Sequence, residues 1–176
     1  MECITPQSLR EAHPALCDPR NLDASIEEVF SMMLGVSCTR MADASVADGQ
    51  TEQGTVTAVI GLGGVVSGAC VFRCSARAAL RLVGRMAGMS FSEVDEMVED
   101  GIGEICNMVA GAWRNRVPEL AAHCGLSVPA VVFGKEYDLH MQSLEFQLRC
   151  AYGFEDVAFT VAIACGGLQQ PKSRAI

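Results

Sequence analysis

Glu104 and Asn107 are the two side chains whose types and spacing could do chemistry. They lie in residues 93–118, the longest periodic segment of the chain, where one offers a carboxylate and the other a neutral carboxamide. At about 100° of rotation per residue, an i,i+3 step places both groups on one face of a helix. The pair therefore predicts a surface that another molecule approaches closely.

The helix that must position this pair has two different sides. One side is apolar and is expected to pack on a sheet: Val98, Ile102, Ile105, Val109 and Ala112. The opposite side carries polar or small residues: Asp100, Glu104, Asn107, Gly111 and Arg114. The segment is therefore predicted to be an amphipathic helix with its functional groups turned away from the core.

Small residues leave the polar side of this helix without bulky side chains. An interior glycine costs a helix about 1 kcal/mol relative to alanine, and the segment contains Gly101, Gly103 and Gly111. We expect Gly103, Ala110 and Gly111 to let a binding partner come close. Asp100 is expected to contact that partner at the rim. Two alternatives stay open, because exposed Glu and Asn are usually only solvated and helix glycines can serve packing.

Three motifs resemble one known family. The run Glu104-x-x-Asn107-Met-Val-Ala-Gly111 is similar to the signature of the CheC/CheX/FliY chemotaxis phosphatases, a helix with E-x-x-N followed by A-G. Ser127-Val-Pro129 resembles the S-x-P that follows this helix in CheX-like sequences. Gly61-Leu-Gly-Gly64, then Gly68, resembles the strand-turn-strand before it. The resemblance is closest to the CheX-like type and runs from about Ile26 to the last strand.

This resemblance implies a phosphatase that hydrolyses the aspartyl phosphate of a CheY-type response regulator. Asn107 would position the attacking water, and Glu104 would dock the lysine that response regulators keep beside their phosphate. No metal or cofactor of the chain's own is expected, because the phosphorylated response regulator holds the Mg²⁺. Apolar strands, an acidic surface and the likeness to CheX together predict a homodimer through a sheet edge or face.

Two other functions stay open on the sequence. A catalytically idle module of the same fold would bind the phosphorylated response regulator and leave its lifetime unchanged. A small-molecule sensor domain would use the apolar hairpin at residues 61–74 to line a pocket. The intact carboxylate and carboxamide favour the phosphatase.

The chain departs from the family pattern after the motif, where the family often continues G-N-A-K. Here Gly111 is followed by Ala112-Trp113-Arg114. Ala112 is expected to face the core, which leaves the functional pair untouched. Trp113 lies about 180° from Glu104 on the helical wheel, so we expect it to pack rather than to bind a ligand.

A weaker copy of the motif occurs in the first predicted helix. Glu28-Val-Phe-Ser31-Met-Met-Leu-Gly35 aligns with the motif at its Glu, Met and Gly, but Ser31 replaces the asparagine. Because this copy lacks the carboxamide, we expect it to be structural.

Composition and charge exclude several classes of function. The formal net charge is −8 and the pI is about 4.8, whereas binding to nucleic acid or to an anionic membrane needs a basic surface. No run approaches the ~18 apolar residues of a membrane span. Residues 1–14 lack the apolar core of a signal peptide, so a cytoplasmic location is expected.

The nine cysteines do not indicate a metal site or a disulfide framework. No C-x-x-C occurs, and His123 beside Cys124 lacks further partners at ligand spacing. Cys70 and Cys74 are expected on one face of a strand. We predict free, buried thiols.

The remaining segments predict an α+β domain, with helices packed on one face of a largely antiparallel sheet in a two-layer, CheC/CheX-like fold. Residues 1–22 are expected to be an irregular leader, 23–165 the domain and 166–176 a flexible tail. The expected helices are 23–34, 76–87 and the central one; the expected strands are 54–62, 65–74, 126–134 (interrupted by Pro129), 137–141, 144–152 and 156–164. Gly63-Gly64 is expected to form a two-residue turn in the first hairpin, and Gly153 is expected near the turn of the last.

Overall fold

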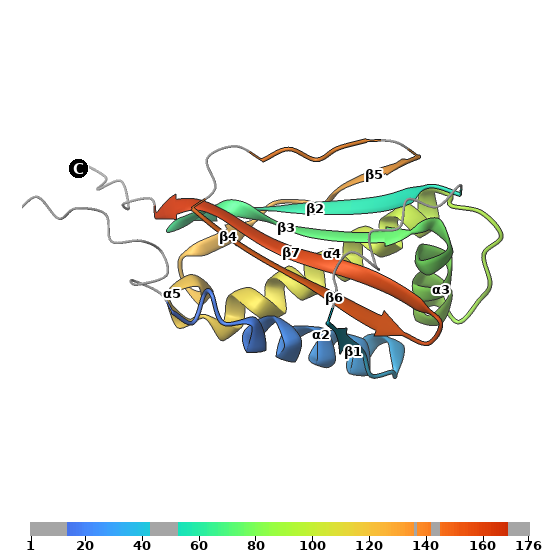
Figure 1. Ribbon diagram of the computed structural model, residues 1–176, viewed down its shortest axis with the longest axis horizontal. Helices are drawn as coiled ribbons and strands as arrows, with labels where there is room; N and C mark the ends of the chain where they lie inside the picture. Colours follow the sequence, from blue (N-terminus) through green and yellow to red (C-terminus); the bar gives the residue numbers. More distant parts are fainter. Residues whose placement is uncertain (1–13, 43–52, 136, 142–144, 169–176) are drawn as a thin grey trace, which may run out of the picture.

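The computed structural model describes residues 14–42, 53–135, 137–141 and 145–168. Within them, one antiparallel sheet has the strand order β1-β6-β7-β3-β2-β4, with β5 also paired to β2. The elements are α2 (Pro19–Leu34), β1 (Thr39–Met41), β2 (Thr55–Gly64), β3 (Val66–Ser75), α3 (Ala76–Ala87), α4 (Glu96–Arg116), α5 (Pro118–Ala121), β4 (Cys124–Leu126), β5 (Ala130–Gly134), β6 (Phe146–Phe154) and β7 (Val157–Leu168). The helices lie on one face of the sheet (Figure 1), which confirms the predicted two-layer α+β fold.

The apolar stripe of α4 packs on the sheet as predicted. Val98, Ile102, Ile105 and Val109 are fully buried, and Ala112 is half-buried at the margin of the core. The buried side is wider than the sequence indicated, because five further residues of the helix are buried: Gly101, Gly103, Cys106, Ala110 and Trp113. The core also contains a stack of aromatic rings. The ring centroid of Phe159 in β7 lies 4.9 Å from that of Phe30 in α2 and 4.8 Å from that of Phe72 in β3.

The first helix begins earlier than predicted. Asp18 caps α2 by accepting a hydrogen bond from the backbone N–H of Arg20 at 3.0 Å, and Pro19 occupies the first helical turn. Leu16 and Leu22 are fully buried. The prediction of a peripheral leader is therefore wrong for its last part, 14–22, while residues 1–13 lie outside the described part of the chain.

The predicted second helix is confirmed, but the two strands of the last hairpin end at other residues than predicted. α3 begins after Ser75, whose side chain accepts a hydrogen bond from Ala78 N–H, and ends at Gly88. The β6–β7 turn is formed by Glu155 and Asp156, so Gly153 lies near the turn as predicted, although β6 continues past it to Phe154. β7 extends to Leu168, so the predicted tail boundary at residue 166 is wrong; residues 169–176 are not among those described.

The predicted two-residue turn at Gly63-Gly64 is wrong. β2 and β3 pair up to Leu62 and Gly68, which leaves five residues between them. Gly64 instead pairs with β4, with φ of 121°, and a Cβ at this position would lie 2.1 Å from the His123 carbonyl oxygen. Glycine is needed there for close approach of the β4 backbone.

The edge of the sheet next to β2 is formed by two short strands, β4 and β5, separated by residues 127–129. This confirms a strand interrupted at Pro129 on a sheet edge. Residues 137–141 are not a strand, contrary to prediction. They run across the sheet face opposite the helices (Figure 1), where the Tyr137 hydroxyl lies 2.6 Å from Thr57 Oγ1.

The eight cysteines within the described residues form no disulfide with one another, as predicted, and six of them are buried. Cys70 and Cys74 are both fully buried on β3, and burial raises the pKa of Cys74 to about 12. In the described ranges, no group of three or more His, Cys, Asp or Glu is arranged to hold a metal ion. The described helices include none that is both long and apolar enough to cross a lipid bilayer.

Replacing either of two glycines of α4 by alanine should change the stability of the fold, in opposite directions. A Cβ at Gly101 would lie 2.7 Å from both Cγ atoms of Val83, which is stiff and buried in α3, whereas at Gly111 the nearest atom is Leu126 Cδ1 at 4.0 Å. We expect Gly101→Ala to lower the free energy of unfolding by about 1–3 kcal/mol through overpacking. Gly111→Ala should raise it by up to about 1 kcal/mol through helix propensity.

Urea unfolding followed by circular dichroism measures both changes on the same scale. Gly111→Ala serves as the control for the general preference of a helix for alanine. Equal stabilisation by the two substitutions would contradict close α3–α4 packing at Gly101.

Candidate functional site

The helix α4 is fixed at both ends by its own sequence. The side chain of Asp95 accepts a hydrogen bond from the backbone N–H of Val98 at 3.0 Å and caps the first turn, which also contains acidic residues. Arg114 and Arg116 lie in the last turn. Both charge placements stabilise the helix dipole, so the middle of α4, where the motif lies, is regular helix.

Glu104 and Asn107 lie one turn apart on the face of α4 that is turned away from the sheet. The side chain of Glu104 is exposed and that of Asn107 is half-buried. Neither side chain has a hydrogen-bond or ion-pair partner among the residues that the structure describes. Asp100 is exposed one turn before Glu104, and Gly111 is half-buried one turn after Asn107. The predicted polar face is therefore open to another molecule.

Gly103 and Ala110 do not lie on that open face. Gly103 is buried, and a Cβ there would lie 3.3 Å from Pro129 Cβ and 3.2 Å from Val131 Cγ2. Ala110 is fully buried in the core. The expectation that these two residues contact a partner is corrected: Gly103 lets α4 pack closely on the sheet edge, and Ala110 is part of the core.

The motifs at Gly61 and at Ser127 meet in space beside α4. Ser127 N–H donates to Gly61 O at 2.9 Å, and Gly61 N–H donates to Ser127 Oγ at 2.8 Å. A Cβ at Gly61 would lie 3.3 Å from Ser127 Oγ, so the absence of a side chain allows this approach. Pro129 in turn packs against Gly103 of α4. Contacts thus link the three resembling motifs to one another, through Gly61 and Ser127 and through Pro129 and Gly103.

The residues after Gly111 have structural positions. Trp113 is fully buried on the side of α4 opposite Glu104, as predicted, and its Nε1 has no acceptor within the described residues. The guanidinium of Arg114 donates to the carbonyl oxygen of Cys124 at 3.2 Å, which ties the end of α4 to β4. The departure from the family pattern therefore leaves the functional pair untouched.

The weaker copy of the motif in α2 is engaged within the fold. Glu28 forms an ion pair with Arg116 of α4. Ser31, at the position of the missing asparagine, donates its hydroxyl to the Glu28 carbonyl oxygen at 3.1 Å. The ion pair joins α2 to α4, the Ser31 hydrogen bond lies within α2, and both agree with a structural role for this copy.

Sequence reasoning missed two exposed apolar side chains, one on α4 and one in the segment that packs against it. Met97, two turns before Glu104 on the same side of α4, is 56% exposed, and Val128, in the segment beside the helix, is 85% exposed. The seven-residue spacing from Met97 to Glu104 could have revealed the first. Val128 could not be found in this way, because its position depends on how residues 127–129 pack on α4.

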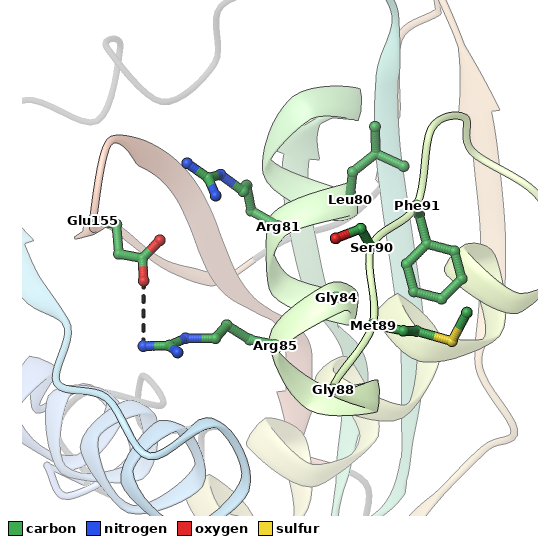
Figure 2. Close-up of a pocket in the computed structure, with 9 residues that line it drawn as sticks. All are labelled: Leu80, Arg81, Gly84, Arg85, Gly88, Met89, Ser90, Phe91 and Glu155. Carbon is green, nitrogen blue, oxygen red and sulfur yellow. Dashed lines mark ion pairs between the residues drawn. The ribbon is translucent and has the colours of Figure 1, made fainter.

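Cavities occur elsewhere on the molecule. One of about 540 Å³ lies between α3, the link after it and the β6–β7 turn; Figure 2 shows Arg85 reaching toward Glu155, at 3.4 Å. Its lining includes neither Glu104 nor Asn107. A second hollow, of about 320 Å³, is lined by Ser67, Gly68 and Ala69 of the β2–β3 hairpin together with residues on the outer face of the sheet. Both are separate from the open face of α4.

Comparison with known proteins gives concordant results. The family model for chemotaxis phosphatase CheX matches residues 56–150. The CheY-P phosphatase CheX of Thermotoga maritima is 29% identical over 150 residues, which are 83% of this chain and 95% of that protein. Among solved structures, CheX of Vibrio vulnificus has a TM-score of 0.67 at 21% identity, covering 83% of this chain and 94% of that one.

A second solved structure contains a partner. The CheX-CheY-BeF3-Mg2+ complex of Borrelia burgdorferi has a TM-score of 0.67 at 18% identity and covers 84% of this chain and 96% of that one. At these identities the solved structures establish the fold alone. The family model covers more than half of the chain and includes both Glu104 and Asn107. The chain belongs to the chemotaxis phosphatase CheX family.

Proposed function

We propose that this chain hydrolyses the aspartyl phosphate of a CheY-type response regulator. The observation that carries the proposal is the open face of α4, where an exposed carboxylate and a half-buried carboxamide lie one turn apart with no partner among the described residues. Its relative from Thermotoga maritima is a CheY-P phosphatase. Two polar groups free of intramolecular bonds are suited to contacts made only in a complex.

Asn107 positions the attacking water. Its amide can accept a hydrogen bond from a water and donate another while remaining neutral beside a highly charged phosphoryl group. The water oxygen forms the new bond to phosphorus, the bond from phosphorus to the aspartyl oxygen breaks, and the products are the aspartate carboxylate and dihydrogen phosphate. An aspartyl phosphate is already activated, so positioning of the water in line with the breaking bond is sufficient for a large rate increase.

Glu104 docks the response regulator. Its exposed carboxylate pairs with the lysine that the regulator keeps beside its phosphate, one helical turn from the water held by Asn107. Asp100, exposed one turn further, is placed at the rim of the same contact. Gly111 leaves room for the regulator's loops on the other side of Asn107.

The Mg²⁺ of the reaction belongs to the response regulator, which keeps it on the phosphate. The Borrelia burgdorferi complex, in which CheX and CheY occur with BeF3 and Mg2+, supports this assignment. A homodimer stays a prediction from the sequence.

Replacement of Asn107 should abolish water positioning and leave docking intact. We expect Asn107→Ala to reduce kcat for the phosphorylated regulator by about 100-fold with little change in KM. Asn107→Asp should be at least as slow, because its carboxylate repels the phosphoryl oxygens. Loss of phosphate from a 32P-labelled regulator measures both variants.

The weaker motif copy in α2 supplies the control for this experiment. Ser31→Ala, at the position that corresponds to Asn107, should leave kcat unchanged. Dephosphorylation by Asn107→Ala at the wild-type rate would contradict the assigned role. A wild-type chain that binds the regulator without shortening the lifetime of its phosphate would favour the catalytically idle module.

Replacement of Glu104 should weaken docking. We expect Glu104→Gln to raise the dissociation constant of the beryllofluoride-activated regulator about tenfold at low salt, because the regulator's lysine loses its charged partner. The difference from wild type should shrink as salt rises, since screening weakens the ion pair. Asp100→Asn, one turn away, is the matched control and should change the dissociation constant far less. An equal effect would show that the negative charge of the whole surface attracts the regulator, rather than a specific ion pair with Glu104.

A further inference from the structure

Val128 is the most exposed of the large apolar side chains in the described part of the chain, at 85%. It lies between Ser127 and Pro129, both of which are engaged with other elements. Because the Val128 side chain is exposed, it contributes almost no hydrophobic stabilisation to the folded chain. Its neighbours nevertheless hold it in a defined position.

Two contacts clamp the backbone on either side of Val128. Ser127 is bound to Gly61 of β2 through its backbone N–H at 2.9 Å and through its Oγ at 2.8 Å. Pro129 packs on Gly103 of α4, where a Cβ would come within 3.3 Å of its ring. A residue before proline is restricted to extended conformations, and the branched Cβ of valine limits its rotamers. The side chain is therefore presented to solvent with little conformational entropy left to lose.

The residues on either side of Val128 lie against the turns of α4 that carry Asn107. Leu126 lies near Gly111, with 4.0 Å from Leu126 Cδ1 to the position of a Cβ there, and Pro129 lies against Gly103. The segment thus runs antiparallel to α4 over the two turns whose middle is Asn107. Val128 belongs to this segment, and we infer from these two contacts that it lies on the sheet-edge side of the turns that carry Asn107.

We propose that Val128 is an apolar contact for the phosphorylated response regulator and sets affinity for it at the edge of the catalytic surface. This inference rests on the proposed phosphatase function. The occupant is the response regulator rather than another protein, because a molecule whose phosphoryl group reaches Asn107 must cover the adjoining side chain as well. Rigid apolar side chains that become buried beside polar anchors contribute strongly to binding.

The proposal is tested with a CheY-type regulator from the same genome, loaded with Mg²⁺ and beryllofluoride for binding and with phosphate for turnover. Val128→Ser removes apolar surface without adding charge near the phosphoryl group. It should raise both Kd and KM about tenfold and leave kcat at saturation unchanged. Val128→Ile, which keeps the apolar surface, should bind like the wild type.

Val132 provides the matched control. It is 48% exposed on β5, but its neighbour Val131 faces Gly103 of α4, so Val132 faces the opposite side of the sheet. Val132→Ser should leave Kd and KM unchanged. Thermal unfolding of all three variants should match the wild type, because both side chains are exposed.

Equal Kd values for Val128→Ser and Val132→Ser would overturn the proposal. A drop in kcat with unchanged KM would also overturn it, since Val128 would then act on the chemical step. If the wild-type chain binds the regulator without releasing phosphate, the phosphatase function fails while the Kd comparison still decides the role of Val128. Absence of binding to every regulator of the genome would overturn both.

Discussion

Close packing of α4 against its neighbours at positions without side chains is the constraint on which the rest of the structure depends. Gly101 admits Val83 of α3, and Gly103 admits Pro129 and Val131 at the sheet edge. Each glycine lowers the stability of the helix relative to alanine. In exchange, neighbouring elements can contact α4 closely on several sides. Because α4 cannot rotate without losing these contacts, one narrow face remains outside, and Glu104 and Asn107 occupy it.

The same constraint explains why the surface around the pair is shaped as it is. The sheet edge comes close to α4 at Gly103, where Pro129 and Val131 contact it, and the half-buried carboxamide of Asn107 lies one turn further along the helix. Glu104 lies further out in solvent. A neutral group in the sheltered position and a charged group in the exposed one suits a reaction in which water must be oriented next to negative charge and the partner must be attracted from a distance.

Much of this arrangement could be predicted from the sequence, because it depends on local patterns. The 3.6-residue period identified the buried stripe of α4, Ser75 and Gly88 marked both ends of α3, and Pro129 marked the break in the edge strand. The same period placed Glu104 and Asn107 on one polar face of α4, whereas their proposed roles came from the resemblance to the family. What could not be predicted depends on contacts between distant segments.

Gly103 and Ala110 show this limit clearly. On a helical wheel both flank the polar face, but Gly103 is covered by Pro129 and Val131 at the sheet edge, and Ala110 is buried in the core. Gly64 looked like a turn residue for the same reason, although it serves the approach of the chain near His123. Residues 137–141 have strand-like composition, yet the Tyr137 hydroxyl anchors them across the sheet through a side chain instead of a backbone ladder.

The structure of this chain bound to a beryllofluoride-activated, Mg²⁺-loaded CheY-type response regulator tests the central claim most directly. The account predicts that the open face of α4 enters the regulator's phosphorylation site, with the Asn107 amide within hydrogen-bond distance of a water in line with the phosphoryl mimic and Glu104 paired with the regulator's lysine. A complex in which the regulator docks elsewhere and leaves Glu104 and Asn107 in solvent would contradict it.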